Sequence, residues 1–207
     1  MFFDPNVDGL KPAPLTHNCY SALVTPRPIG WISTISTDGV INLAPYSFFN
    51  MATGDPMHVM VCVNGFHKDG GMKDTVVNAE NQGEFVFNLC DAGLLEQMNA
   101  SSEHFPRSVD EMAAAGLAAE PAEKVAPPRV KAAKIHLECK YVQTVRLPDG
   151  KNGSPNNIVI GKVVGIHIAD EILTDGVIDY AKLKPLARLG YLEYAVVEET
   201  FTVVRPD

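Results

Sequence analysis

A proline-bracketed stretch, Thr25–Thr34, constrains this chain more than any other part of its sequence. Pro26 and Pro28 fix their own φ angles and favour extended backbone in the residues before them. After these prolines the side chains of Trp31, Ser33 and Ile35 alternate with those of Ile32, Thr34 and Ser36. An alternation of period two is typical of a β-strand. Asp38-Gly39 is then a strong tight-turn signal, so the residues from Val40 onward are predicted to return as the partner strand of a hairpin.

The returning strand runs into Ala44-Pro45, where pairing is expected to lapse because Pro45 has no N–H to donate. The segment Tyr46–Asn50 follows, and it is rich in aromatic and hydroxyl side chains. Backbone outside a ladder leaves N–H and C=O groups free to face a planar polar ligand. An ordinary loop has the same composition, so both interpretations stay open at this point.

A second stretch joins a polar, glycine-rich loop to the start of a helix. The loop follows a predicted buried strand, His58–Val63, and it carries two lysines. Asp74 or Thr75 is expected to cap a short helix, Val76 to about Gln82, which ends at Gly83. Unpaired N–H groups beside a lysine suit an anion. The alternative is an ordinary helix cap with solvated lysines, which this feature alone favours.

Strands outnumber helices in the rest of the chain. Residues 158–168 are predicted to form a strand whose two glycines indicate bulges or barrel bends. Residues 188–194 are expected to be a loop and residues 199–204 a final strand. The predicted fold class is mainly β with inserted α: one domain, residues 1–207, built on a small antiparallel barrel with helices inserted mainly between residues 74 and 116.

Charge and cysteine usage exclude several classes of function. The formal net charge of −8 argues against nucleic acid and against a polybasic membrane contact. The N-terminus does not have the pattern of a signal peptide, and no apolar run is long enough to span a bilayer. The four cysteines lie far apart, as expected for reduced, buried thiols in a cytoplasmic protein.

The sequence also lacks the short motifs of several enzyme classes. There is no G-x-G-x-x-G after a strand, no phosphate-binding P-loop, no H-E-x-x-H and no G-x-S-x-G. The six histidines show no metal-ligand spacing, so no metal site is predicted. If this protein catalyses a reaction, a bound cofactor is therefore a better explanation for the chemistry than its own side chains.

Several motifs, in order along nearly the whole chain, resemble the flavin reductase-like family of FMN-binding split barrels. They are Thr25–Thr34 (TPRPIGWIST), Asn42–Asn50 (NLAPYSFFN), Lys73–Thr75 (KDT), Gly83–Leu89 (GEFVFNL), Met98–Ser102, Ser108–Glu111, Ala126–Val130 and Arg188–Gly190. The resemblance implies a six-stranded antiparallel split barrel of Greek-key type, and a homodimer that binds FMN near the subunit interface.

The resemblance also implies which residues bind the cofactor. Near the ribityl-phosphate it places Ser33 and Thr34. Along the isoalloxazine ring it places Ala44, Pro45, Tyr46, Ser47, Phe48, Phe49 and Asn50. At the phosphate it places Lys73, Asp74 and Thr75. The family often carries an arginine ahead of the Lys-Asp-Thr motif, for which Lys68 is a substitute here. Arg27 is either a ligand residue or a structural clamp, and Trp31 is expected in the core rather than on the ring.

The function implied is that of an NAD(P)H:flavin reductase. NADH or NADPH would pass hydride to the flavin N5, and the electrons would leave to free flavin, a partner monooxygenase or another acceptor. Hydride transfer needs no acid or base, so no catalytic side chain is predicted. The alternative is a flavoredoxin-like, FMN-binding electron carrier without NAD(P)H activity. A barrel that has lost flavin is disfavoured by the intact motifs.

Overall fold

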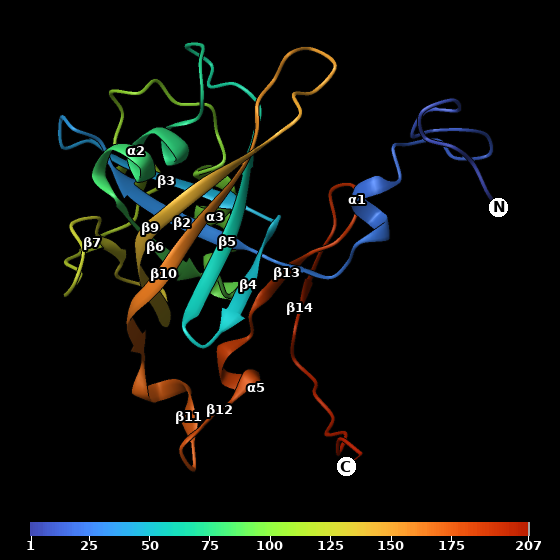
Figure 1. The fold of residues 1–207 in the computed structure, drawn as a ribbon. Helices are drawn as coiled ribbons and strands as arrows, with labels where there is room; N and C mark the ends of the chain where they lie inside the picture. Colours follow the sequence, from blue (N-terminus) through green and yellow to red (C-terminus); the bar gives the residue numbers. More distant parts are fainter. Residues whose placement is uncertain (207) are drawn as a thin grey trace.

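A computed structural model, which describes residues 1–206, contains one large antiparallel sheet (Figure 1). Along the sheet the strand order is β3-β2-β6-β9-β10-β5-β4. The bounds are β2 Gly30–Ile35, β3 Ile41–Tyr46, β4 Phe49–Gly54, β5 Met57–Asn64, β6 Glu84–Leu89, β9 Ile135–Leu147 and β10 Asn156–Ile168. The mainly β prediction is confirmed. The sheet has seven strands instead of six, because Phe49–Gly54 pairs with β5 as a strand of its own.

The two edges of this sheet meet, so the sheet curls into a barrel. Edge strand β3 contacts β5, which lies next to the opposite edge strand, β4. The chain passes from β3 to β4 through only two residues, Ser47 and Phe48. A direct step between opposite edges requires those edges to lie side by side. The Ser47-Phe48 crossing therefore marks the split in the barrel, where the two edge strands meet without pairing.

The expectation that pairing lapses at Pro45 is wrong. Pro45 lies opposite Trp31, and the ladder continues to the pair Gly30 and Tyr46. Because β3 is an edge strand, one side of it has no neighbour in the sheet. A proline is tolerated where its missing N–H would point away from the ladder.

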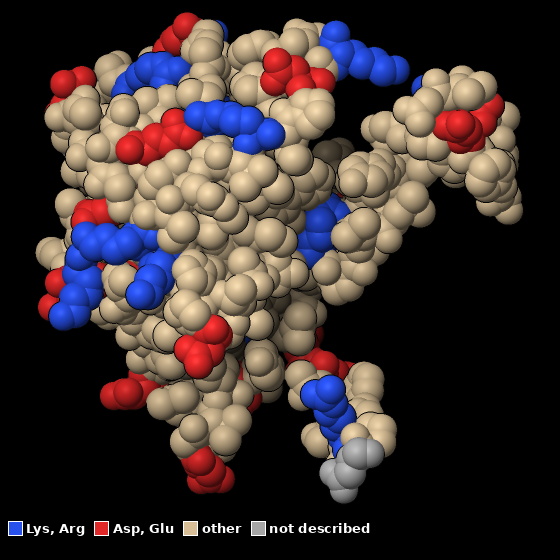
Figure 2. All heavy atoms as spheres, in the orientation of Figure 1, with Lys and Arg blue, Asp and Glu red and all other residues tan. Residues whose placement is uncertain are grey.

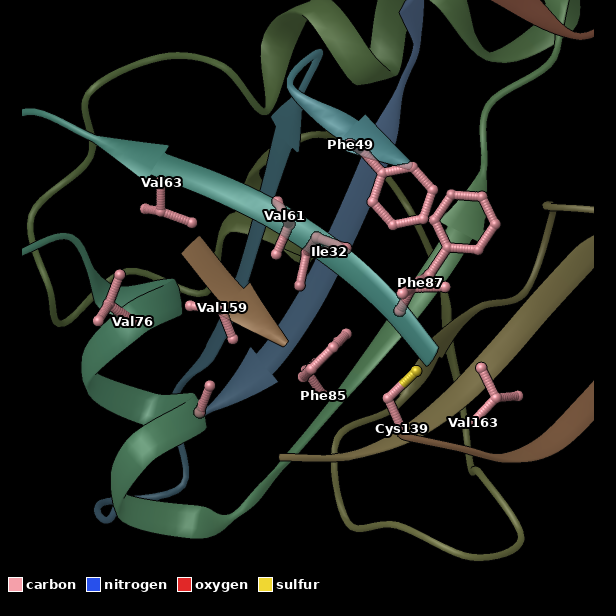
Figure 3. Close-up of a cluster of buried hydrophobic side chains, with 12 residues drawn as sticks. Ile32, Phe49, Val61, Val63, Val76, Phe85, Phe87, Cys139, Val159 and Val163 are labelled. Carbon is pink, nitrogen blue, oxygen red and sulfur yellow. The ribbon is translucent and has the colours of Figure 1, made fainter. Parts of the chain in front are cut away.

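Apolar side chains fill the inside of the barrel (Figure 3). The Phe49 and Phe87 rings stack with centroids 4.6 Å apart. Helix α2 (Asp74–Gln82) covers one opening and contributes Val76 and Ala79 to the same cluster. The other members are Ile32, Val59, Val61, Val63, Phe85, Cys139, Val159 and Val163. Burial of this much apolar surface is the main favourable contribution to the free energy of folding.

A second apolar cluster lies outside the barrel, under the inserted helices. Trp31 is fully buried there, as expected, and its indole N–H donates to Ser101 Oγ at 2.9 Å. Helices α3 (Leu95–Ala100) and α4 (Glu111–Ala114) contribute Met98 and Met112 to this cluster. Strand β2 is therefore buried on both faces, because the barrel core packs on one face and this second cluster packs on the other.

The smaller elements complete the chain. They are α1 Tyr20–Leu23, β1 Arg27–Pro28, η1 Ala92–Leu94, β7 Ala119–Glu120, β8 Arg129–Val130, η2 Asp170–Ile172, β11 Leu173–Thr174, β12 Val177–Ile178, α5 Tyr180–Leu183, β13 Leu186–Arg188 and β14 Tyr194–Val196. Most of the helical residues, those of α2, η1, α3 and α4, fall between residues 74 and 116 as predicted. Within residues 1–206, each helix is too short or too polar to cross a membrane.

Two local predictions are wrong. The N-cap of α2 is Lys73, not Asp74 or Thr75, although Gly83 ends the helix in the left-handed region (φ +73°) as predicted. Near the C-terminus the expected loop is present at residues 189–193, where it joins strands β13 and β14, but residues 199–204 form no strand in the described chain. Phe201 in that segment is 89% exposed, so its alternating pattern has no neighbouring strand to pack against.

The predicted bulges in β10 are confirmed, and one of them is a point of close packing. Register shifts against β9 occur at Ile160/Gly161 and at Val163/Gly165. A Cβ added at Gly161 would lie 2.3 Å from the Phe85 ring and 3.1 Å from Cys139 Cβ. The barrel core closes over this glycine.

Gly161→Ala is therefore expected to lower the free energy of unfolding by about 2 kcal/mol or more, because the core is overpacked. Urea denaturation measures the change. Gly54→Ala is the matched control: it also lies in a strand, nothing lies within 4 Å of an added Cβ, and a change below about 0.5 kcal/mol is expected. Equal effects of the two substitutions would refute the packing explanation.

Candidate functional site

Three hollows follow one another along the segment Ala44–Asn50. The narrow hollow, about 80 Å³, is lined by Ala44–Tyr46 together with Lys73 and Asp74. The central hollow, about 440 Å³, is lined by Pro45, Ser47 and Phe48. The outer hollow, about 410 Å³, is lined by Ser47–Asn50. Neighbouring hollows share wall residues, which are Pro45 for the narrow and central hollows and Ser47 and Phe48 for the central and outer ones. We refer to this row of three hollows across the split in the barrel as the groove.

A helix terminus and a lysine meet in the narrow hollow. Helix α2 begins at Asp74, and Lys73 stands before it in extended backbone. Within the described chain no side chain caps this terminus. The first N–H groups of a helix have no partner inside the helix, and the helix dipole adds positive potential there. This end of the groove suits an anionic group.

An arginine from a distant segment holds the loop before α2 in place. Arg107 forms an ion pair with Asp74 and donates from Nη2 to the carbonyl oxygens of Gly70 and Met72, both at 2.9 Å. His67 Nε2 lies 3.4 Å from Asp74 Oδ2 on the other side. Asp74 is thereby occupied within the protein. The sequence analysis missed Arg107, since nothing in a sequence pairs residue 107 with residue 74.

Three predicted site residues lie behind the hollows rather than in their walls. Ser33 and Thr34 are fully buried, and Thr75 is 1% exposed. Ser33 Oγ donates to the Pro128 carbonyl at 2.6 Å. Thr34 Oγ1 accepts from the amides of Asn42 and Asn78, both at 3.1 Å. Their direct contact with a ligand stays a prediction; in this structure their hydroxyls fix the wall from behind.

Tyr46 carries this buried network to the surface of the groove. Its hydroxyl lies 2.8 Å from Thr75 Oγ1, which also accepts from Asn42 Nδ2 at 3.0 Å. Burial raises the pKa of Tyr46 well above the usual range. Tyr46 is therefore a neutral phenol whose orientation is fixed by Thr75.

Of the two roles considered from the sequence for Arg27, ligand residue or structural clamp, the structure supports the clamp. Arg27 is 6% exposed, and its guanidinium donates to the carbonyl oxygens of Ser21, Val24 and Leu189. The same guanidinium lies 5.6 Å from the centre of the Phe48 ring. Phe48 is 41% exposed, so an apolar ring faces the groove at the barrel split.

A family model described as a flavin reductase-like domain matches residues 22–186. An uncharacterized protein of Aquifex aeolicus is 40% identical over 169 residues, 81% of this chain and 83% of its own. An uncharacterized protein of Halalkalibacterium halodurans is 41% identical over 184 residues, 88% of this chain and 87% of its own.

Solved structures are similar over almost the full length. Nitrilotriacetate monooxygenase component B from Bacillus cereus has a TM-score of 0.86 at 29% identity, covering 98% of both chains. The Pseudomonas fluorescens 2-nitrobenzoate 2-nitroreductase has a TM-score of 0.76 at 26% identity, covering 90% of this chain and 88% of its own. A putative flavin reductase with a split barrel domain from Shewanella frigidimarina has a TM-score of 0.81 at 21% identity, covering all of both chains. These neighbours confirm the predicted split barrel.

One carboxyl in the narrow hollow has a raised pKa. Burial raises the pKa of Glu111 to about 7, although a hydrogen bond from the Leu43 N–H (2.7 Å) and the charge of Lys73 both act to lower it. In the unfolded chain a glutamate ionises near its ordinary pKa of 4.5. Because the folded protein holds its proton to higher pH, folding stability is expected to fall as the pH rises from about 4.5 to about 7.

Glu111→Gln imitates the neutral carboxyl, so the variant should lose this decline. It should match the wild type near pH 4 and exceed it by on the order of 1 kcal/mol at pH 8, a value reduced for solvent in the hollow. Urea unfolding from pH 4 to 8 measures the difference. Glu103→Gln, on an exposed carboxyl of the same hollow, is the control. A Glu111→Gln difference that is constant with pH would contradict the assignment.

Proposed function

This chain belongs to the flavin reductase-like domain family, and from that premise we propose that it is an FMN-binding oxidoreductase that accepts hydride from NADH or NADPH. The observation that carries the proposal is the row of three neighbouring hollows along Ala44–Asn50. One end of this groove suits an anion, and the other presents an exposed aromatic ring. FMN has the same polarity along its length, with a phosphate at one end and a flat ring system at the other.

The phosphate end of FMN fits the narrow hollow. Lys73 and the uncapped N-terminus of α2 supply a point charge and N–H donors. Three carboxyls, those of Asp74, Glu103 and Glu111, line the same hollow. Arg107 offsets the charge of Asp74, and burial raises the pKa of Glu111. Tyr46 adds a hydroxyl whose position is fixed by Thr75.

The flavin ring fits the central hollow. Ser47 and Phe48 lie outside the ladders of β3 and β4, so their backbone is not committed to sheet pairing, apart from the Phe48 carbonyl, which accepts from the Cys62 N–H at 2.8 Å. Pro45 and Phe48 offer apolar surface on which a planar ring can lie. These features support the ring-binding role expected of Pro45, Ser47 and Phe48. Ala44 and Tyr46 line the narrow hollow instead, and Phe49 and Asn50 line the outer one.

The protein's part in the reaction is to position FMN and its reaction partner and to exclude water from between them. Bound FMN would supply the hydride chemistry at its N5 atom. Arg27 and the buried asparagine network keep the groove walls fixed, which lowers the reorganisation needed when charge develops. Stacking surface at Phe48 and Pro45 orients reactants face to face. No side chain is assigned as catalytic.

Two relatives above 25% identity support an oxidoreductase. One is a monooxygenase component and the other a nitroreductase. We propose accordingly that the electrons pass on to free flavin, to a partner monooxygenase or to a small acceptor. The alternative is a flavoredoxin-like carrier, whose electrons come from another protein.

We also propose a homodimer and a cytoplasmic location. Apolar side chains on the outer surface of β9 and β10 support the dimer, because Val142 and Ile166 are each 49% exposed and Ile168 is 43% exposed. The four cysteines are unpaired, which suits a reducing compartment. Sedimentation equilibrium should give twice the chain mass; a monomer at micromolar concentration would refute the dimer.

The hydride step is tested by loading the protein with FMN without oxygen and adding NADH or NADPH. The flavin absorbance should bleach, and added free flavin should be reduced over many turnovers. FMN that binds but stays oxidised would refute the reductase and support the carrier. Failure to bind FMN would refute both.

The phosphate assignment is tested by Lys73→Ala. The affinity for FMN should fall by roughly tenfold, because a charge-assisted contact is lost. The affinity for riboflavin, which has no phosphate, should not change. Lys68 was expected from the sequence to substitute for an arginine at the phosphate, but it is exposed and does not line the narrow hollow. Lys68→Ala is therefore the control and should change FMN affinity less than twofold. Equal losses for both flavins after Lys73→Ala would contradict the assignment.

A further inference from the structure

The central hollow carries a positive charge that FMN does not explain. Two arginines, Arg27 and Arg188, lie in its walls, and none of its described lining residues is acidic. The whole chain has a formal net charge of −8, so a hollow with two guanidinium groups and no carboxylate has the opposite sign of charge to the protein as a whole. Figure 2 shows basic atoms recessed where the body meets the segment around α1 and β13.

The two arginines differ in what their donors already contact. Arg27 is buried, and its donors are used by backbone carbonyl oxygens. Arg188 is half-buried and donates from Nη2 to the Tyr191 carbonyl. No carboxylate lies within ion-pair distance of Arg188 in the part of the chain that the structure describes. Arg188 therefore has a charge and several N–H donors left for a ligand.

The surroundings of Arg188 hold its guanidinium in one place. The group lies over the Tyr194 ring, 4.4 Å from the ring centre. Tyr191, whose carbonyl accepts the hydrogen bond, has a left-handed backbone (φ +56°), which costs free energy for a non-glycine residue. The turn is also tight against α1, since a Cβ at Gly190 would lie 2.4 Å from Ala22 Cβ. A stacked and hydrogen-bonded guanidinium loses little entropy when it binds an anion.

We propose that Arg188 binds an anionic group of the second substrate, the molecule that meets the flavin ring in the central hollow. The proposal rests on the proposed function, in which FMN directs its own phosphate to Lys73 in the narrow hollow. Arg188 is then free for a phosphate of a reduced nicotinamide dinucleotide, or for a carboxylate on an electron acceptor. Both sources share one chemistry, a planar or multidentate oxyanion that a guanidinium fork matches.

Arg188→Met and Arg188→Lys test this role in the FMN-loaded protein. Arg188→Met keeps much of the apolar stem over Tyr194, and Arg188→Lys keeps the charge. The donor NADH is compared with 1-benzyl-1,4-dihydronicotinamide, which delivers hydride but has no phosphate. Arg146→Met is the matched control, because Arg146 pairs with Glu80 at 2.7 Å on the β9–β10 hairpin, outside the hollow.

The expected result is a KM for NADH that rises about tenfold or more in Arg188→Met, with kcat little changed. Arg188→Lys should restore part of the affinity. The KM for the benzyl analogue, the affinity for FMN and the behaviour of Arg146→Met should stay within twofold of the wild type. An unchanged KM for NADH together with unchanged binding of the anions below would overturn the proposal, as would a loss of FMN affinity without a loss of riboflavin affinity. The latter would place the cofactor phosphate at Arg188.

Direct binding separates this inference from the reductase activity. ADP-ribose and benzoate, which carry no hydride, are titrated into the FMN-loaded wild type and Arg188→Met by calorimetry. Binding of ADP-ribose that needs Arg188 supports the dinucleotide as source, and binding of benzoate that needs Arg188 supports a carboxylate acceptor. Either result stands even if NADH fails to reduce the flavin. If neither anion depends on Arg188 and turnover with NADH is normal, the reductase is right and the Arg188 proposal is wrong.

Discussion

The groove depends on one constraint: the chain passes from one edge of the sheet to the other through only Ser47 and Phe48. Two residues cannot bridge distant strands, so the edges must lie side by side. The seven strands therefore curl around the core of Phe85, Phe87 and their neighbours. Because the edges meet without pairing, the crossing residues present backbone and an aromatic ring to the outside. The three hollows all touch this crossing or the strand residues just before it.

Charge is arranged along the groove by contacts that lie far apart in the sequence. Arg107 neutralises Asp74 at the helix start, burial raises the pKa of Glu111 to about 7, and Lys73 lines the narrow hollow. At the central hollow, the N–H donors of Arg27 are hydrogen-bonded to carbonyl oxygens, whereas Arg188 keeps several donors for a ligand. In the arrangement that we propose, this acidic protein has two separate places for anions. This suits a reaction between an anionic cofactor and an anionic second substrate.

The sequence predicted the strands well, because alternation and turn signals are local. The bulges at Gly161 and Gly165 were also readable, since a glycine inside a strand marks a bulge or a tight bend. The pairing of Pro45 could not be predicted from the sequence, because only the sheet order shows that β3 is an edge strand. The inward hydroxyls of Ser33 and Thr34 were missed for a related reason: β2 is buried on both faces, so its pattern does not say which side chains face a ligand. Arg107 and Arg188 act through contacts that no local pattern contains.

The central claim is that the barrel split at Ser47-Phe48 and the start of α2 hold one flavin between them. Hydrogen–deuterium exchange of the backbone, with and without FMN, tests it directly. FMN should slow exchange in two separate segments, Tyr46–Asn50 and Lys73–Val76, and leave the β11–β12 hairpin (Leu173–Ile178) unchanged. Protection confined to one of the two segments, or found at neither, would contradict the account.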